Sequence, residues 1–116
     1  MNIIPNDVFE NYIYKNENCI LVQDPKHNSE AFHYTIWYIK EHIKDIYSII
    51  PEVMKLLKEF IEEIKQLELF KNEKMYFTYP PNIKSLHLHI LPYDYISHRP
   101  LNELFLFENI HNIYQL

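Results

Sequence analysis

An amphipathic pattern over residues 51–68 is the feature that most limits the folds open to this chain. Apolar residues recur there at spacings of three and four, which places them on one face of an α-helix. They are Val53, Leu56, Leu57, Phe60, Ile61, Ile64 and Leu67. Pro51 suits the first helical turn, where its missing N–H would have no partner anyway. Each such side chain contributes about 1.5–3 kcal/mol when buried, so we expect this helix to dock on a sheet.

Short apolar and β-branched runs predict the strands of that sheet. The runs cover residues 19–23, 30–39, 74–79 and 86–91, and an alternation over 8–16 is typical of an edge strand or an irregular lead-in. We therefore expect an α+β fold, an antiparallel sheet of about five strands packed on one long amphipathic helix. At 116 residues the chain is long enough for one such domain, over residues 1–116, and too short for two.

The run from residue 85 to residue 90 carries the candidate chemistry. Its side chains alternate between polar and apolar, so Ser85, His87 and His89 are predicted to share one face of a strand. At a rise of roughly 3.3 Å per residue, the two imidazoles lie about 7 Å apart along the strand and are able to act on one ligand. A solvated pair, a catalytic pair and a metal-binding pair all remain open from this pattern.

The metal interpretation needs further ligands, because zinc takes four. Cys19, His98 and His111 are candidates, but none lies at a zinc-finger spacing from His87 or His89. Cys19 sits in an apolar run, which is more typical of a small core residue than of a ligand or a nucleophile. A single cysteine also rules out a disulfide within the chain.

The segment LHLHILP resembles the signature of the histidine triad superfamily of nucleotide hydrolases and transferases, His-φ-His-φ-His-φ-φ with φ apolar. Aligned on it, Ser85 takes the place of the first histidine, His87 of the central one and His89 of the third. The longer run YFTYPPNIKSLHLHIL is similar to the scavenger mRNA decapping branch, and so is the upstream run CILVQDPK. The resemblance extends over most of the chain and favours a helix in residues 101–116, where the pattern alone also allows a strand over 104–107.

This resemblance implies a fold, an activity and a set of site residues. His87 is implied to attack phosphorus and form a nucleotidyl-histidine that water resolves, with His89 donating to the phosphate oxygens and Ser85 in the supporting network. The implied substrates are cap-like or dinucleoside polyphosphate compounds, and neither a cofactor nor a metal is expected. Four residues are implied to bind the substrate, namely Asp24, Lys26, Asn82 and Lys84. Tyr12, Tyr14 and Trp37 are candidates for stacking on its base.

The missing first histidine leaves an alternative open. A hydroxyl at Ser85 donates and accepts hydrogen bonds but carries no charge near pH 7. The chain is then either a weakened enzyme or a catalytically inactive nucleotide- or cap-binding module. Family members are dimers, and the excess of Tyr, Phe and Ile fits an apolar interface between two copies, so a homodimer is expected.

Net charge and hydropathy limit the kinds of partner that the protein is expected to bind. A net charge of −5 argues against an extended nucleic-acid surface, which would be basic. The absence of glycine excludes a Gly-rich phosphate loop. No apolar run approaches 18 residues and the amino terminus lacks an apolar signal segment, so we expect no membrane partner and a cytoplasmic location.

Overall fold

A six-stranded antiparallel sheet forms the centre of the computed structural model, which describes residues 4–23, 34–70, 73–81, 83–91 and 100–114. The strands are β1 (Tyr12–Lys15), β2 (Cys19–Gln23), β3 (Tyr34–Tyr38), β4 (Lys74–Thr78), β5 (His87–Leu91) and β6 (Leu104–Leu106). Their order across the sheet is β1-β2-β3-β5-β4-β6. The helices are α1 (Asn6–Glu10), α2 (Pro51–Lys65) and α3 (Phe107–Tyr114). The predicted α+β class is confirmed, with one strand more than the five expected.

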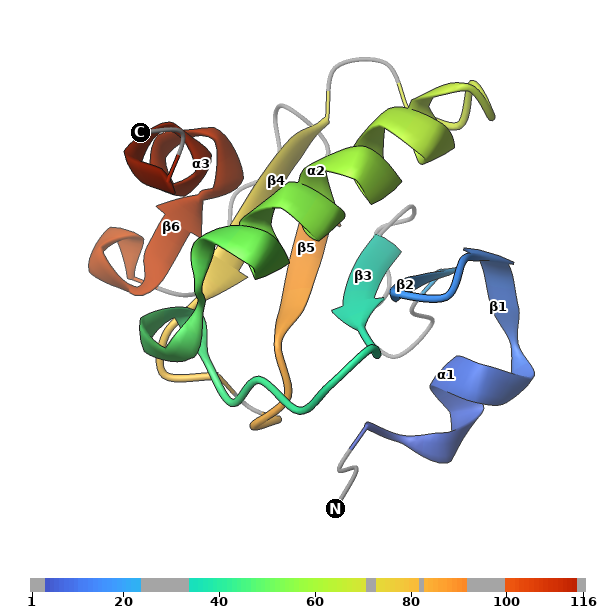
Figure 1. The fold of residues 1–116 in the computed structure, drawn as a ribbon, viewed down its shortest axis with the longest axis horizontal. Coiled ribbons are helices and arrows are strands. Elements are labelled where there is room, and N and C mark those ends of the chain that lie inside the picture. The colour runs from blue at the N-terminus through green and yellow to red at the C-terminus, as the bar shows by residue number, and fades with distance from the viewer. Residues whose placement is uncertain (1–3, 24–33, 71–72, 82, 92–99, 115–116) are drawn as a thin grey trace.

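Helix α2 lies across one face of the sheet and covers the main core (Figure 1). Six of its side chains are buried, namely Val53, Met54, Leu57, Phe60, Ile61 and Ile64. Five of them confirm the predicted apolar face, Met54 was not predicted, and the predicted Leu56 is half-buried against the core. Leu88 and Ile90 of β5 belong to the same buried cluster as these helix residues. Leu67, predicted to extend the apolar face, lies beyond the end of the helix and is exposed. The chain turns there through Glu68, whose φ of 57° is left-handed. Glycine usually occupies such a position, but this chain contains no glycine.

A smaller apolar cluster, formed by Ile4, Val8, Ile20, Val22 and Trp37, lies apart from the core under α2. Here the sequence interpretation of residues 8–16 needs correcting, because Val8 belongs to helix α1 and only Tyr12–Lys15 form a strand. The alternation of apolar residues was too short to distinguish one helical turn from a strand. Helix α1 supplies Val8 to this second cluster.

The carboxyl-terminal region contains both of the elements that its pattern allowed. Residues Leu104–Leu106 form the edge strand β6, which pairs with β4, and the helix expected from the resemblance begins at Phe107. Phe107 is buried in the main core. The expectation of a helix is thus confirmed for Phe107–Tyr114 and wrong for Leu104–Leu106.

One carboxylate connects α2 to the first hairpin. Tyr14 donates its hydroxyl proton to Glu63 Oε1 at 2.7 Å, and Asn16 Nδ2 donates to Glu63 Oε2 at 2.9 Å. The side chain of Asn16 also accepts from the backbone N–H of Asn18 and of Cys19, which builds the turn between β1 and β2. Glu63 therefore holds this hairpin against the helix.

Within the described parts of the chain, no helix combines the length and the apolar character that a membrane crossing requires.

Candidate active site

Strand β5 carries His87 and His89 on the face of the sheet opposite α2. Their neighbours Leu86 and Leu88 are buried in the core under α2, so the alternation places both imidazoles on the other side. The two rings meet edge to face, with centroids 4.9 Å apart and planes at 64°. His87 is only 9% exposed, while His89 is half-buried. The predicted shared face is confirmed for His87 and His89, whereas Ser85 lies before the strand begins. The interpretation of His87 as a solvated surface histidine is wrong.

A backbone carbonyl fixes the tautomer of His87. Its Nδ1 lies 2.8 Å from the carbonyl oxygen of Ser85, in a buried contact. A carbonyl oxygen only accepts, so Nδ1 carries the proton and, in the neutral ring, Nε2 carries the lone pair. The carbonyl is itself held in place, because the backbone N–H groups on either side of it, those of Ser85 and Leu86, donate to Ile83 and Ile43 at 2.8 and 2.7 Å.

Ser85 therefore acts on His87 through its main chain. The residue is 2% exposed, and the contact described between the two residues uses its carbonyl oxygen and not its hydroxyl. Any side chain that leaves the backbone in place would supply the same acceptor. A serine at this position consequently supplies the acceptor that holds the tautomer of His87.

The ring of Trp37 covers one face of His87. Trp37 and His87 are cross-strand partners on β3 and β5, and their rings stack with centroids 4.1 Å apart and planes at 14°. Trp37 Nε1 donates to Thr35 Oγ1 at 2.9 Å, so the polar atom of the indole is satisfied although the side chain is only 4% exposed. One face of the indole is thus occupied by the imidazole, and stacking of Trp37 on a base stays a prediction. The sequence gives no sign of this contact, which depends on the register between two strands far apart in the chain.

The predicted substrate-binding residues fall mostly outside the described parts of the chain. Asp24, Lys26 and Asn82 all lie there, whereas Lys84 is described and is exposed next to Ser85. Of the other aromatic candidates, Tyr12 is exposed on the edge strand β1. The other, Tyr14, is engaged with the carboxylate of α2, which raises the pKa of its phenol through the hydrogen bond.

Cys19 and His111, two of the proposed additional metal ligands, do not join the histidine pair. Cys19 is buried in the main core under α2, and burial raises the pKa of its thiol to about 12, with a further contribution from the carboxylate of Glu63. His111 lies on α3, on the same side of the sheet as α2. His98 lies outside the described residues. Among the residues that the structure describes, no group of three or more His, Cys, Asp and Glu side chains is arranged to hold a metal ion.

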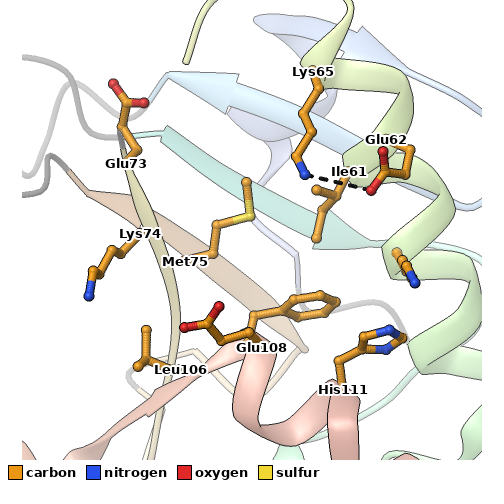
Figure 2. Close-up of a pocket in the computed structure, with 11 residues that line it drawn as sticks. Ile61, Glu62, Lys65, Glu73, Lys74, Met75, Leu106, Glu108 and His111 are labelled. Atoms are coloured by element: carbon orange, nitrogen blue, oxygen red, sulfur yellow. Dashed lines mark ion pairs between the residues drawn. The ribbon is translucent and has the colours of Figure 1, made fainter. Parts of the chain in front are cut away.

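A cavity of about 710 Å³ lies between α2, β4 and α3 (Figure 2). Its apolar lining includes Ile61, Met75 and Phe107, and an ion pair between Lys65 and Glu62, 3.6 Å apart, crosses its rim. The cavity belongs to the α2 side of the sheet, so it is separate from the histidine pair. The histidine pair that the sequence predicts and this cavity thus lie on opposite faces of the sheet.

The sequence and the fold of this chain are similar to those of known proteins. The family model "Scavenger mRNA decapping enzyme C-term binding" matches residues 1–102. No curated protein matches the sequence. Among solved structures, an HIT family hydrolase from Legionella pneumophila Philadelphia 1 is similar, with a TM-score of 0.58 and 17% identity, covering 77% of this chain and 86% of that one. A histidine triad protein from Clostridium difficile has a TM-score of 0.59 and 18% identity, covering 78% of this chain and 84% of that one.

These structures share the fold, and the family match covers most of the sequence. The resemblance read from the two histidines and the segments around them is therefore confirmed. The chain belongs to the scavenger mRNA decapping enzyme carboxyl-terminal family, within the histidine triad superfamily.

Proposed function

We propose that the protein is a nucleotide phosphohydrolase or nucleotidyl transferase of the cytoplasm that works through a covalent nucleotidyl-histidine on His87. The observation that carries the proposal is the 2.8 Å contact between His87 Nδ1 and the carbonyl of Ser85. It gives the neutral ring a lone pair at Nε2, which is what a nucleophile needs.

The reaction divides into two displacements at phosphorus. In the first, the Nε2 lone pair of His87 forms a bond to phosphorus while the bond to the bridging oxygen breaks, and the leaving phosphate takes that electron pair. In the second, water attacks the same phosphorus and gives up one proton to the solvent, the N–P bond breaks, and its electron pair returns to Nε2. The proposed steps use no metal, because the departing phosphate is already a stable anion.

The intermediate carries a positive charge on the imidazole, because Nδ1 keeps its proton while Nε2 is bonded to phosphorus. The Ser85 carbonyl stabilises this charge, since a hydrogen bond to an ionised group contributes about 1.5–3 kcal/mol. His89, whose ring centroid lies 4.9 Å from that of His87, is the group assigned to the phosphate oxygens. When protonated it would also supply the proton that the leaving group takes.

Recognition of the substrate is assigned to Asp24, Lys26, Asn82 and Lys84. Asp24 would accept from the N–H edge of a purine, and Lys26, Asn82 and Lys84 would bind phosphate oxygens. The substrates that suit this set are cap-like and dinucleoside polyphosphate compounds. Lys84 supports the assignment by its exposed position beside Ser85.

The test is turnover of a cap dinucleotide and of adenosine phosphoramidate by four proteins. They are the wild type and the variants His87→Ala, His89→Ala and His42→Ala, the last of which removes an exposed histidine from the loop after β3. We expect His87→Ala to lose at least about 10³-fold in kcat/KM, since no other group replaces the nucleophile. The His42→Ala variant should keep the wild-type rate.

The results separate the proposal from its alternatives. Equal turnover by the wild type and His87→Ala would contradict the enzyme. Binding of the cap dinucleotide in calorimetry, without turnover and without a trapped phosphohistidine, would select the inactive binding module instead. Activity that follows added zinc and disappears with a chelator would select the metal protein.

We also propose that the protein forms a homodimer. Strand β1 lies at one edge of the sheet, where Tyr12 and Ile13 are 43% and 42% exposed, and Phe9 of α1 is 38% exposed next to it. An edge strand with unpaired backbone groups and apolar side chains is a surface that a second copy can extend. Sedimentation equilibrium of the wild type and of Ile13→Lys tests this, and a wild type that stays monomeric at high concentration would contradict it.

A further inference from the structure

We propose that Trp37 is a positioning residue for His87, an inference that rests on the function proposed above. Its indole covers the imidazole and, together with the carbonyl of Ser85, determines where Nε2 points. Trp37 is the only tryptophan of the chain, and it stacks on the candidate nucleophile with ring centroids 4.1 Å apart.

The hydrogen bond of His87 to Ser85 and its stack on Trp37 restrict different motions of the imidazole. The Nδ1 hydrogen bond to Ser85 prevents the ring from flipping, because a flip would put a carbon where the donor is. That bond alone still allows the ring to tilt about the line joining the two atoms. The nearly parallel indole, at 14°, blocks the tilt. Each of these two contacts supplies a restraint that the other lacks, and together they set the direction of Nε2.

Trp37 is itself held firmly enough to serve as a support. Its N–H donates to Thr35 Oγ1 at 2.9 Å, which fixes the rotation of the indole in its own plane. It is also a member of the small apolar cluster, with Val8 of α1 and with Val22 and Ile20 of β2. The ring is 4% exposed and so has little room to move. The support for His87 therefore reaches from the neighbouring strand to helix α1.

The stack also matches the charge that the reaction creates. The imidazole becomes cationic when phosphorus bonds to Nε2, and the face of an indole attracts a cation within about 6 Å. The neutral resting ring gains less from this contact than the cationic intermediate does. A group that stabilises the intermediate more than the ground state raises kcat and leaves KM nearly unchanged.

The first experiment compares Trp37→Leu, Trp37→Phe and Val22→Ala. We expect Trp37→Leu to lower kcat about 10-fold with KM within twofold, and Trp37→Phe, which keeps an aromatic face, to recover most of that loss. Val22→Ala removes a member of the same cluster that is not stacked on His87, so it controls for lost stability. An equal loss of kcat in Val22→Ala and Trp37→Leu would overturn the inference.

The second measurement needs no substrate and so separates this inference from the proposed function. Nitrogen-15 NMR of the histidine rings distinguishes the two neutral tautomers. We expect the Nδ1–H form of His87 in the wild type, in Trp37→Phe and in Trp37→Leu, because the carbonyl of Ser85 holds it. The Nε2 signal should be broadened only in Trp37→Leu, where the ring is able to tilt. An Nε2 signal as sharp as in the wild type, together with wild-type kcat in Trp37→Leu, would overturn the inference even in an active enzyme. Should the wild type prove inactive, the width of the Nε2 signal alone decides it.

A third measurement does not depend on any tryptophan variant being folded. A stacked imidazolium quenches indole emission, so the fluorescence of Trp37 in the wild type should change when His87 is protonated. The change should be lost in His87→Gln and kept in His42→Gln. A fluorescence titration that survives in His87→Gln would contradict the contact.

Discussion

Replacing Ser85 by alanine separates the two ways in which this residue could support His87. The contact in the structure uses the carbonyl oxygen of Ser85, 2.8 Å from His87 Nδ1, and alanine keeps that carbonyl. We therefore expect Ser85→Ala to retain kcat/KM within about threefold, a difference of less than about 0.7 kcal/mol in transition-state stabilisation. A hydroxyl that took part in proton transfer would instead contribute about 10²–10⁴-fold. The two expectations differ by at least a factor of about 30.

The assay is steady-state hydrolysis of a cap dinucleotide, accompanied by a thermal melt of each protein. Ser48→Ala, which removes an exposed serine from the short helical turn before α2, is the matched control. Ser85 is 2% exposed, so the melt detects any loss of packing that would complicate the rate. A fall of 100-fold or more in Ser85→Ala, with an unchanged melting temperature and an unchanged His87 tautomer, would refute the reasoning.

Three further predictions concern the second histidine, the hairpin contact and the buried thiol. His89→Ala should lower kcat by about 10²–10⁴-fold in rapid-mixing assays, and a wild-type rate would remove His89 from the chemistry. Glu63→Ala loses both hydrogen bonds to the first hairpin, so its melting temperature should fall by about 3–10 °C, whereas Glu62→Ala, which breaks only an exposed ion pair, should fall by at most about 2 °C. In Glu63→Gln the pKa of Tyr14 should drop back toward its ordinary value, measured by ultraviolet titration, because the carboxylate is what raises it. The pKa of Cys19 is raised from 9.0 to about 12 mainly by burial, so its contribution to stability is complete below pH 9 and is lost as pH rises toward 12. Urea unfolding at a series of pH values should show that, between pH 9 and pH 12, the free energy of unfolding falls more steeply with pH in the wild type than in Cys19→Ala. The same dependence on pH in both proteins would contradict the burial of the thiol.

The sequence predicts the main elements of the fold because the helical spacing of its apolar residues and the alternation in its strands are both clear. The spacing of apolar residues from Val53 to Ile64 suffices for helix α2, and the alternation around His87 suffices for strand β5 and for the face that it turns away from the core. Local pattern fails where an element is too short to show a period. Helix α1 has five residues and β6 has three, and their structures depend on packing against the sheet.

The candidate site is predictable only as far as local spacing determines it. That His87 and His89 share a face follows from residues two positions apart. The other two features of the site do not follow from local spacing. The position of the Ser85 carbonyl depends on a bend held by backbone hydrogen bonds to Ile83 and Ile43. The contact of Trp37 with His87 depends on the register between β3 and β5. The contacts of Leu86 with Ile43 and of His87 with Trp37 join segments far apart in the chain, and neither segment alone shows that the other lies beside it.

The most direct test is to identify the nitrogen that bonds to phosphorus. The wild type is mixed with adenosine phosphoramidate, quenched in alkali to preserve phosphohistidine, and analysed by phosphorus-31 NMR and by mass spectrometry of the peptide containing residues 85–91. The account predicts one adduct, on Nε2 of His87, because Nδ1 is held by the carbonyl of Ser85. An adduct on Nδ1, an adduct on another residue, or turnover with no adduct at any time would contradict it.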